Sequence, residues 1–143
     1  MHSNVLVTIR GTQNDGTEQD TIETISHGQY RFLTDKHAVS FEELLPSEAN
    51  TTISIKNILK ITDETVTLTK RGVTQTEMFF QQGHTFCGFY QTPFGTFDMA
   101  LHTSRLKITS QDDLLRAEID YALELNGQHV SDCSIQISVT SNN

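Results

Sequence analysis

The sequence has no tryptophan and only two prolines and two cysteines among its 143 residues. Two cysteines cannot supply the disulfide framework of a small secreted domain, and a chain of this length can bury a core without one. Cys87 and Cys133 each lie on a strand-like pattern among apolar neighbours. We therefore expect two buried free thiols in a cytoplasmic protein.

Basic residues and long apolar runs are also scarce. Ten lysines and arginines stand against 18 acidic residues, which gives a net charge of −8. Nucleic-acid binding needs clustered basic residues to neutralise phosphates, so we expect no nucleic-acid partner. No apolar window approaches the roughly 20 residues that span a bilayer. The N-terminal segment alternates polar and apolar residues instead of resembling a signal peptide, so we expect no membrane partner.

The sequence motifs of common enzymes and metal sites are missing. There is no phosphate-binding glycine loop, no Gly-x-Ser-x-Gly elbow and no acid spacing typical of calcium loops. The six histidines include no His-x-His or His-x-x-x-His pair. Cys87 and His84 are three residues apart in a predicted strand and point to opposite faces, so they do not form a nucleophile–base pair. We expect no catalytic residues, no metal site and no cofactor.

The chain does contain strong alternation of polar and apolar residues. Residues 115–125 give the clearest case, because apolar side chains there alternate with charged ones. A period of two places one face of a strand against a core and the other in water. Segments of this kind, joined by short turns and without a convincing helix, follow one another along the chain. We predict an all-β protein, a single antiparallel β-barrel domain over residues 1–143 with hairpin-linked strands.

The alternation also assigns side chains to the two faces of the predicted sheet. The outward set is charged and comprises Arg116, Glu118, Asp120 and Glu124. The inward set is apolar and comprises Phe97, Met99, Leu101, Leu115, Ile119, Tyr121, Leu123, Ile135 and Ile137.

Several segments predict bends and turns in these strands. The alternation changes phase between Leu101 and Leu106 and again after Ile55, and a one-residue shift is typical of a bulge. Bent strands allow a sheet to close into a barrel. Residues 93–95 and 126–127 predict hairpin turns, because Pro-x-Gly and Asn-Gly reverse a chain readily. Pro46 indicates a loop over residues 44–50.

Four short segments occur in a distinctive order: ISHGQY at 25–30, VSFEE at 39–43, KRG at 70–72 and YQTPFG at 90–95. In this order they resemble the YwiB-like family of uncharacterised bacterial proteins over nearly the whole chain. The resemblance implies a calycin-type barrel, the fold of lipocalins and fatty-acid-binding proteins, and implies no activity. Relatives often have tyrosine where this chain has Phe41, and the lipocalin Gly-x-Trp signature is missing, so the likeness to lipocalins concerns fold alone.

The order of these segments does not identify a ligand, but their side chains suggest a site. Glu43 is predicted to share the inward face of its strand with Phe41, where a carboxylate needs a partner. Lys70 and Arg71 lie at a strand end, where the simplest reading is a solvated turn at the rim of a barrel. Small-molecule pockets usually combine an apolar wall with a few polar groups. The candidate ligand-binding residues are the aromatic Tyr30, Phe41 and Tyr90 with the charged Glu43, Lys70 and Arg71.

Three functional classes remain open at this point. The first is a binding module that encloses a small, partly apolar molecule, with an anionic group favoured by the basic residues at the rim. The second is a structural or protein-interaction barrel whose interior is filled by its own side chains, with a homodimer as one form of it. Enzyme activity is the third. An interior cavity of a few hundred cubic ångströms would favour binding over interaction.

Overall fold

The computed structural model describes residues 1–46 and 52–142 and contains ten antiparallel strands in that part of the chain. Each strand pairs with the next along the chain, and β1 pairs with β10, so the sheet closes into a barrel. No helix in the described residues could span a membrane. The predicted all-β, hairpin-linked antiparallel barrel is confirmed. Its strands are β1 (Asn4–Asn14), β2 (Gln19–Leu33), β3 (Lys36–Pro46), β4 (Thr52–Ile61), β5 (Thr65–Arg71), β6 (Gln75–Gln81), β7 (Thr85–Thr92), β8 (Gly95–Gln111), β9 (Leu114–Leu125) and β10 (Gln128–Ser141).

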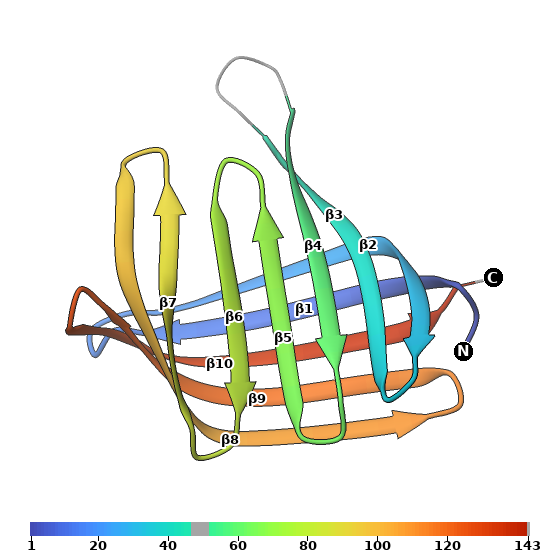
Figure 1. Cartoon of the computed structure of the whole chain (residues 1–143). Helices are drawn as coiled ribbons and strands as arrows, with labels where there is room; N and C mark the ends of the chain where they lie inside the picture. The colour runs from blue at the N-terminus through green and yellow to red at the C-terminus, as the bar shows by residue number, and fades with distance from the viewer. Residues whose placement is uncertain (47–51, 143) are drawn as a thin grey trace.

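The strands form two layers that cross at a steep angle (Figure 1). β1, β9 and β10 run across the view, whereas β3 to β7 run nearly upright in front of them. The two longest strands, β2 and β8, bend from one layer into the other. In β8 the register against β9 shifts between Thr103 and Arg105, which confirms the bulge expected between Leu101 and Leu106.

Gly28 marks the bend in β2, where the strand changes its neighbours. It pairs with Val5 of β1 on one side and with Phe41 of β3 on the other. A Cβ atom at this position would lie 3.0 Å from the backbone oxygen of Ser40 and 3.2 Å from the side chain of Val7. The two layers can therefore approach this closely only because residue 28 has no side chain.

The hydrophobic core fills one end of the barrel, called here the packed end. The largest side chains there are at most 1% exposed: Val5, Val7, Val39, Leu59, Ile61, Val66, Phe80, Leu101, Leu115, Ile119, Ile137 and Val139. Leu123, Ile135 and Phe97 are half-buried, and the other predicted inward residues are buried. The expected faces of β8, β9 and β10 are thus confirmed.

The hairpin turns follow the backbone requirements of their residues. Asn126 and Gly127 have φ angles of 52° and 79°, as the Asn-Gly pair predicts. Gly95 has a φ of 141° and closes the β7–β8 hairpin opposite Thr92. Both predicted turns are confirmed.

Three expectations from the sequence are wrong in the described residues. Leu44–Pro46 continue β3 as its last three residues, while positions 47–50 of the expected loop lie outside the described residues. β3 and β4 pair without a register shift, so there is no bulge after Ile55. Cys87 is exposed, because Gly88 and not Cys87 shares the inward face of β7; Cys133 is buried as expected.

Candidate functional site

A cavity of about 620 Å³ opens at the end of the barrel opposite the packed end. We call it the barrel cavity, and this end the open end. Its wall draws on every strand of the barrel, and most of its side chains are apolar. The lining residues are Ile9, Gly11, Thr12, Gln13, Asp20, Ile22, Thr24, Glu43, Ile55, Leu68, Lys70, Thr74, Thr76, Met78, Tyr90, Met99, Tyr121, Leu123, Leu125, Cys133, Ser134 and Ile135.

The cavity exists because neighbouring strands diverge at the open end. β2 pairs with β3 only from Gly28 to Leu33, so residues 19–27 pair with β1 alone among the described strands. β6 and β7, by contrast, stay paired at the open end, Gln75 with Gln91 and Thr76 with Tyr90. The ends of the β5–β6 and β7–β8 hairpins lie above β2 in the view of Figure 1.

An ion pair lies on the wall of this cavity. The Nζ atom of Lys70 donates a hydrogen bond to Oε1 of Glu43 over 2.7 Å. The two side chains are 25% and 13% exposed, so the pair is largely withdrawn from water. Water screens the attraction between the two charges only weakly in such a setting. Removing one partner would leave the other charge poorly solvated.

Lys70 is part of a line of inward polar residues that crosses four strands. Asn57 of β4 lies opposite Lys70 of β5, Lys70 opposite Thr76 of β6, and Thr76 opposite Tyr90 of β7. Glu43 of β3 reaches the same line through its ion pair. We call these five residues the polar row. In the lining, Leu68 and Met78 lie on the core side of this row and Ile55 lies on its hairpin side.

Sequence reasoning missed two members of the polar row, Thr76 and, more informatively, Asn57. It is 1% exposed, and its Nδ2 atom donates to the backbone oxygen of Ile55 over 3.2 Å. Its Oδ1 atom is buried without a hydrogen-bond partner among the described residues. The signal was present as the change of phase after Ile55: Asn57 takes an inward position and Ile58 faces outward, 42% exposed. That change indicates a buried polar residue here, not a bulge.

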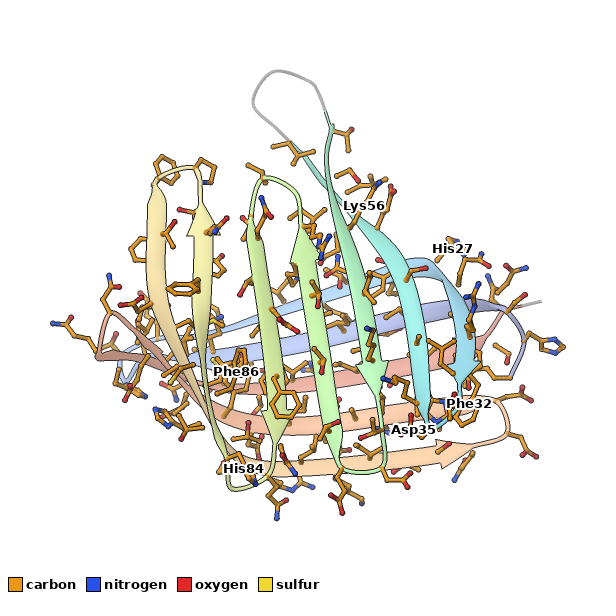
Figure 2. All side chains as sticks on the ribbon, in the orientation of Figure 1. His27, Phe32, Asp35, Lys56, His84 and Phe86 are labelled. Carbon is orange, nitrogen blue, oxygen red and sulfur yellow. The ribbon has the colours of Figure 1, made fainter. Side chains whose placement is uncertain are left out.

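The structure brings three of the six predicted site residues together. Glu43, Lys70 and Tyr90 line the barrel cavity. Arg71 is exposed and follows Lys70 in the strand, so its side chain points to the outer face, opposite Lys56 of β4. Figure 2 labels Lys56 on the upper part of that strand.

Tyr30 and Phe41 lie away from the cavity lining. Phe41 is 5% exposed and belongs to the hydrophobic core. The Tyr30 hydroxyl lies 2.7 Å from Nδ1 of His37, near the β2–β3 turn, where Phe32 and Asp35 are labelled in Figure 2. Partial burial raises the pKa of Tyr30 and lowers the pKa of His37. The negative charge of Asp63 partly offsets the lowering at His37. This pair belongs to the packed end.

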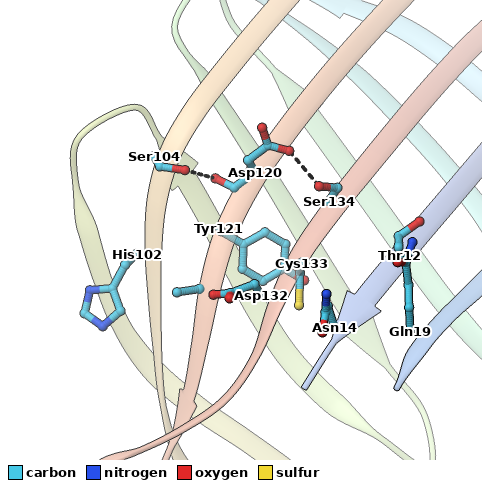
Figure 3. Close-up of a pocket in the computed structure, with 11 residues that line it drawn as sticks. Thr12, Asn14, Gln19, His102, Ser104, Asp120, Tyr121, Asp132, Cys133 and Ser134 are labelled. Atoms are coloured by element: carbon cyan, nitrogen blue, oxygen red, sulfur yellow. Dashed lines mark hydrogen bonds between the residues drawn. The ribbon is translucent and has the colours of Figure 1, made fainter. Parts of the chain in front are cut away.

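A second hollow, the outer groove, lies on the outer surface of β8, β9, β10 and β1 (Figure 3). Its volume is about 580 Å³, and polar side chains such as Thr12, His102 and Asp132 dominate its lining. Asp120 accepts hydrogen bonds there, from Ser134 to its carboxylate over 2.7 Å and from Ser104 to its backbone oxygen over 3.2 Å. Ser104 and Ser134 are thus satisfied by Asp120, as is common for polar groups of folded proteins.

Tyr121 and Cys133 separate the two hollows and line both. Burial, with a smaller contribution from Cys133, raises the pKa of Tyr121 far above its ordinary value. The phenol is therefore neutral at any physiological pH and can donate a hydrogen bond. Within residues 1–46 and 52–142, no group of three or more His, Cys, Asp or Glu side chains could hold a metal ion.

Comparisons with known proteins agree with the architecture. The model of a family described as a domain of unknown function, DUF1934, matches residues 7–137. The crystal structure of the ywiB protein from Bacillus subtilis superposes with a TM-score of 0.80 at 17% identity, covering 99% of this chain and 93% of that one. At this identity the likeness shows the fold alone. No curated protein matches the chain. The resemblance noted in the sequence is thus confirmed, and the chain belongs to the DUF1934 family, a domain of unknown function.

Proposed function

We propose that the protein is a binding module that takes up a small, partly apolar molecule in the barrel cavity. One observation carries this proposal: the interior holds about 620 Å³ of space that opens to the surface, lined by apolar side chains with a few polar groups among them. Small-molecule sites have this size and this composition. A barrel that served only as a scaffold would gain stability by filling the space with larger side chains.

The polar row has no net charge. Lys70 is the one basic residue among the described lining residues, and Glu43 neutralises it. Arg71, the other basic residue expected at the rim, faces outward. The basic residues therefore no longer favour an anionic group on the ligand. The proposal rests on the apolar lining and concerns the apolar body of the ligand.

A fluorescence titration with Nile red, a neutral apolar dye, tests the proposal. We expect saturable binding of one dye molecule per chain. Ile135→Trp places an indole inside the cavity and should abolish binding, whereas Gln136→Trp places the same bulk on the outer face of β10 and should leave it unchanged, because Ile135 lines the cavity and Gln136 is exposed. Native mass spectrometry of the freshly purified protein should show a bound small molecule that Ile135→Trp removes. Equal dye binding by the two variants would contradict the proposal.

A second candidate function is self-association through the open edge of β2. Residues 19–27 have no neighbour on one side among the described strands, and Ile22 and Ile25 in this segment are 68% and 65% exposed. An exposed, apolar strand edge is a template for pairing with another chain. The occupant proposed is the same segment of a second copy, giving a homodimer. Analytical ultracentrifugation should then show a dimer that Ile25→Lys dissociates; a monomer at all concentrations would exclude it.

A further inference from the structure

The polar row places both signs of charge at one point of the cavity wall. Lys70 and Glu43 are joined over 2.7 Å, so any ligand group that reaches one of them also meets the field of the other. Asp20, an exposed residue of β2, adds a further carboxylate to the lining. At the Lys70–Glu43 pair, a single charge on a ligand would therefore be attracted by one residue and repelled by the other.

The ion pair leaves hydrogen-bonding capacity unused on both partners. An ammonium group has three N–H donors, and the contact with Glu43 uses one of them. A carboxylate has two oxygens, and Oε2 of Glu43 is the atom left free by that contact. The pair can thus donate to a ligand and accept from it at the same time.

The neighbours in the polar row reinforce this double character. The hydroxyl of Thr76 donates to the backbone oxygen of Phe89 over 3.0 Å, so it is left with acceptor capacity. The hydroxyl of Tyr90 can donate or accept. Asn57 brings a buried carbonyl oxygen that no described residue satisfies, directly opposite Lys70 in the register. Lys70, Glu43 and Thr76 thus each use part of their hydrogen-bonding capacity within the protein and keep part of it for a ligand.

A charged ligand head fits this arrangement poorly. A free carboxylate would contact Lys70 but lie beside Glu43, and an ammonium group would contact Glu43 but lie beside Lys70. Because the two side chains are only 25% and 13% exposed, water screens these repulsions incompletely. A head with zero net charge, carrying one hydrogen-bond donor and one acceptor, meets no such repulsion and can pair with both residues.

From this geometry, and resting on the proposed function, we infer that the barrel cavity selects amphipathic molecules whose polar head has no net charge and both donates and accepts a hydrogen bond, with the Lys70–Glu43 pair as the selecting element. Primary amides and zwitterions that carry an N–H group share this chemistry. The apolar body of the ligand lies against the lining below the row, which includes Leu68, Met78 and Leu123.

Displacement of Nile red by four probes with ten-carbon chains tests the inference: decanamide, decyl phosphoethanolamine, decanoate and decylammonium. At pH 7 the unmodified protein should bind the neutral amide or the zwitterion at least about tenfold more tightly than either ion, a difference typical of charge-based discrimination. A preference for the amide over the phosphoethanolamine, or the reverse, identifies which kind of head without net charge is bound more tightly; both fit the inference.

Single substitutions should invert this preference in opposite directions. Glu43→Gln leaves Lys70 without its partner, so decanoate should become the tightest ligand. Lys70→Met leaves Glu43 without its partner, so decylammonium should become the tightest. Glu42→Gln and Arg71→Met are the matched controls, because they remove the same charges from neighbouring positions of β3 and β5 that are exposed. They should leave the preference unchanged, which separates a local contact from the net charge of the molecule.

Each result is decisive for one of the two proposals. The inference would be overturned, while the proposed function stands, if all four probes bind with equal affinity. It would also be overturned if neither variant changes the preference, provided that far-UV circular dichroism shows the variant to be folded. If Glu43→Gln fails to fold, Lys70→Met carries the test alone, and decylammonium must become its tightest ligand. Failure of every probe to displace Nile red, or absence of dye binding, would overturn the proposed function and the inference with it.

Discussion

At the packed end of the barrel the inward side chains of opposite strands meet, whereas at the open end the inward side chains of the same strands border empty space. Val7, Val66 and Leu115 at the packed end are at most 1% exposed. Leu123 and Ile135, farther along the same sheet, are only half-buried and line the cavity. The residue types are alike at both ends. The difference lies in strand pairing, because β2 and β3 are joined at one end and diverge at the other.

The two ends also treat polar side chains differently. At the packed end Tyr30 and His37 satisfy each other over 2.7 Å, with Phe32 edge-on to His37 at a centroid distance of 5.1 Å. At the open end the polar row presents an ion pair and partly used hydroxyls to the cavity. A polar pair closed on itself contributes to stability, whereas groups with unused capacity are available to a ligand.

The strongest test of this comparison is truncation of one core residue at each end. Phe80→Ala should lower the free energy of unfolding by about 3–5 kcal/mol, because Phe80 is fully buried and packs on Tyr121. Ile135→Ala should cost about 1 kcal/mol, because its side chain already borders open space and truncation creates little new cavity. Urea titrations followed by circular dichroism give both values. Equal losses would mean that the open end is packed in solution.

A smaller effect is expected in the turn that closes the β9–β10 hairpin beside the cavity. Gly127→Val should cost more than about 1 kcal/mol, because its φ of 79° strains a β-branched residue. Gln128→Val, at the first residue of β10, is the control and should change stability little, since strands tolerate valine. An unchanged melting temperature for Gly127→Val would show that this hairpin does not hold the register seen here.

At the packed end, His37 should make the free energy of unfolding depend on pH. Burial lowers the pKa of His37 below its ordinary value of 6.5, so the folded protein binds a proton there less readily than the unfolded chain. The free energy of unfolding should therefore fall as the pH drops from about 6.5 towards the lowered pKa, and this contribution should be fully present above pH 6.5.

His37→Asn should flatten that part of the stability profile, measured by urea titration between pH 5 and pH 8. His84→Asn is the matched control, because His84 is exposed at the β6–β7 turn. A profile that keeps its slope in His37→Asn but loses it in His84→Asn would reverse the assignment.

The smallest effect is expected on the outer face, which is common to both ends. Glu118 lies 3.2 Å from Arg105 in an ion pair whose side chains are 25% and 51% exposed. Pairs of this kind contribute little in water, so Glu118→Ala should change the free energy of unfolding by less than about 0.5 kcal/mol. A loss equal to that of Ile135→Ala would mean that the outer charges form a more tightly coupled network than single pairs.

The candidate site could be predicted from the sequence only in part. Glu43 and Lys70 were predictable because strand alternation gives the face of each residue, and an inward carboxylate calls for a partner. Arg71 was grouped with Lys70 as a basic strand end, although adjacent residues of one strand face opposite sides. Asn57 was missed because the phase change beside it has two explanations, a bulge or a buried polar residue, which local sequence cannot separate.

The sequence by itself determined the strands, the faces of their side chains, the Asn126–Gly127 turn and the bulge in β8, because each depends on local periodicity and backbone preference. Only the tertiary structure decided that β2 and β3 separate beyond Gly28, and hence that one end of the barrel is packed and the other hollow. The separation of two strands depends on how the whole sheet bends and closes. Contacts between residues far apart in the chain determine that bending and closure. The Lys70–Glu43 pair, 27 residues apart, is a consequence of that closure.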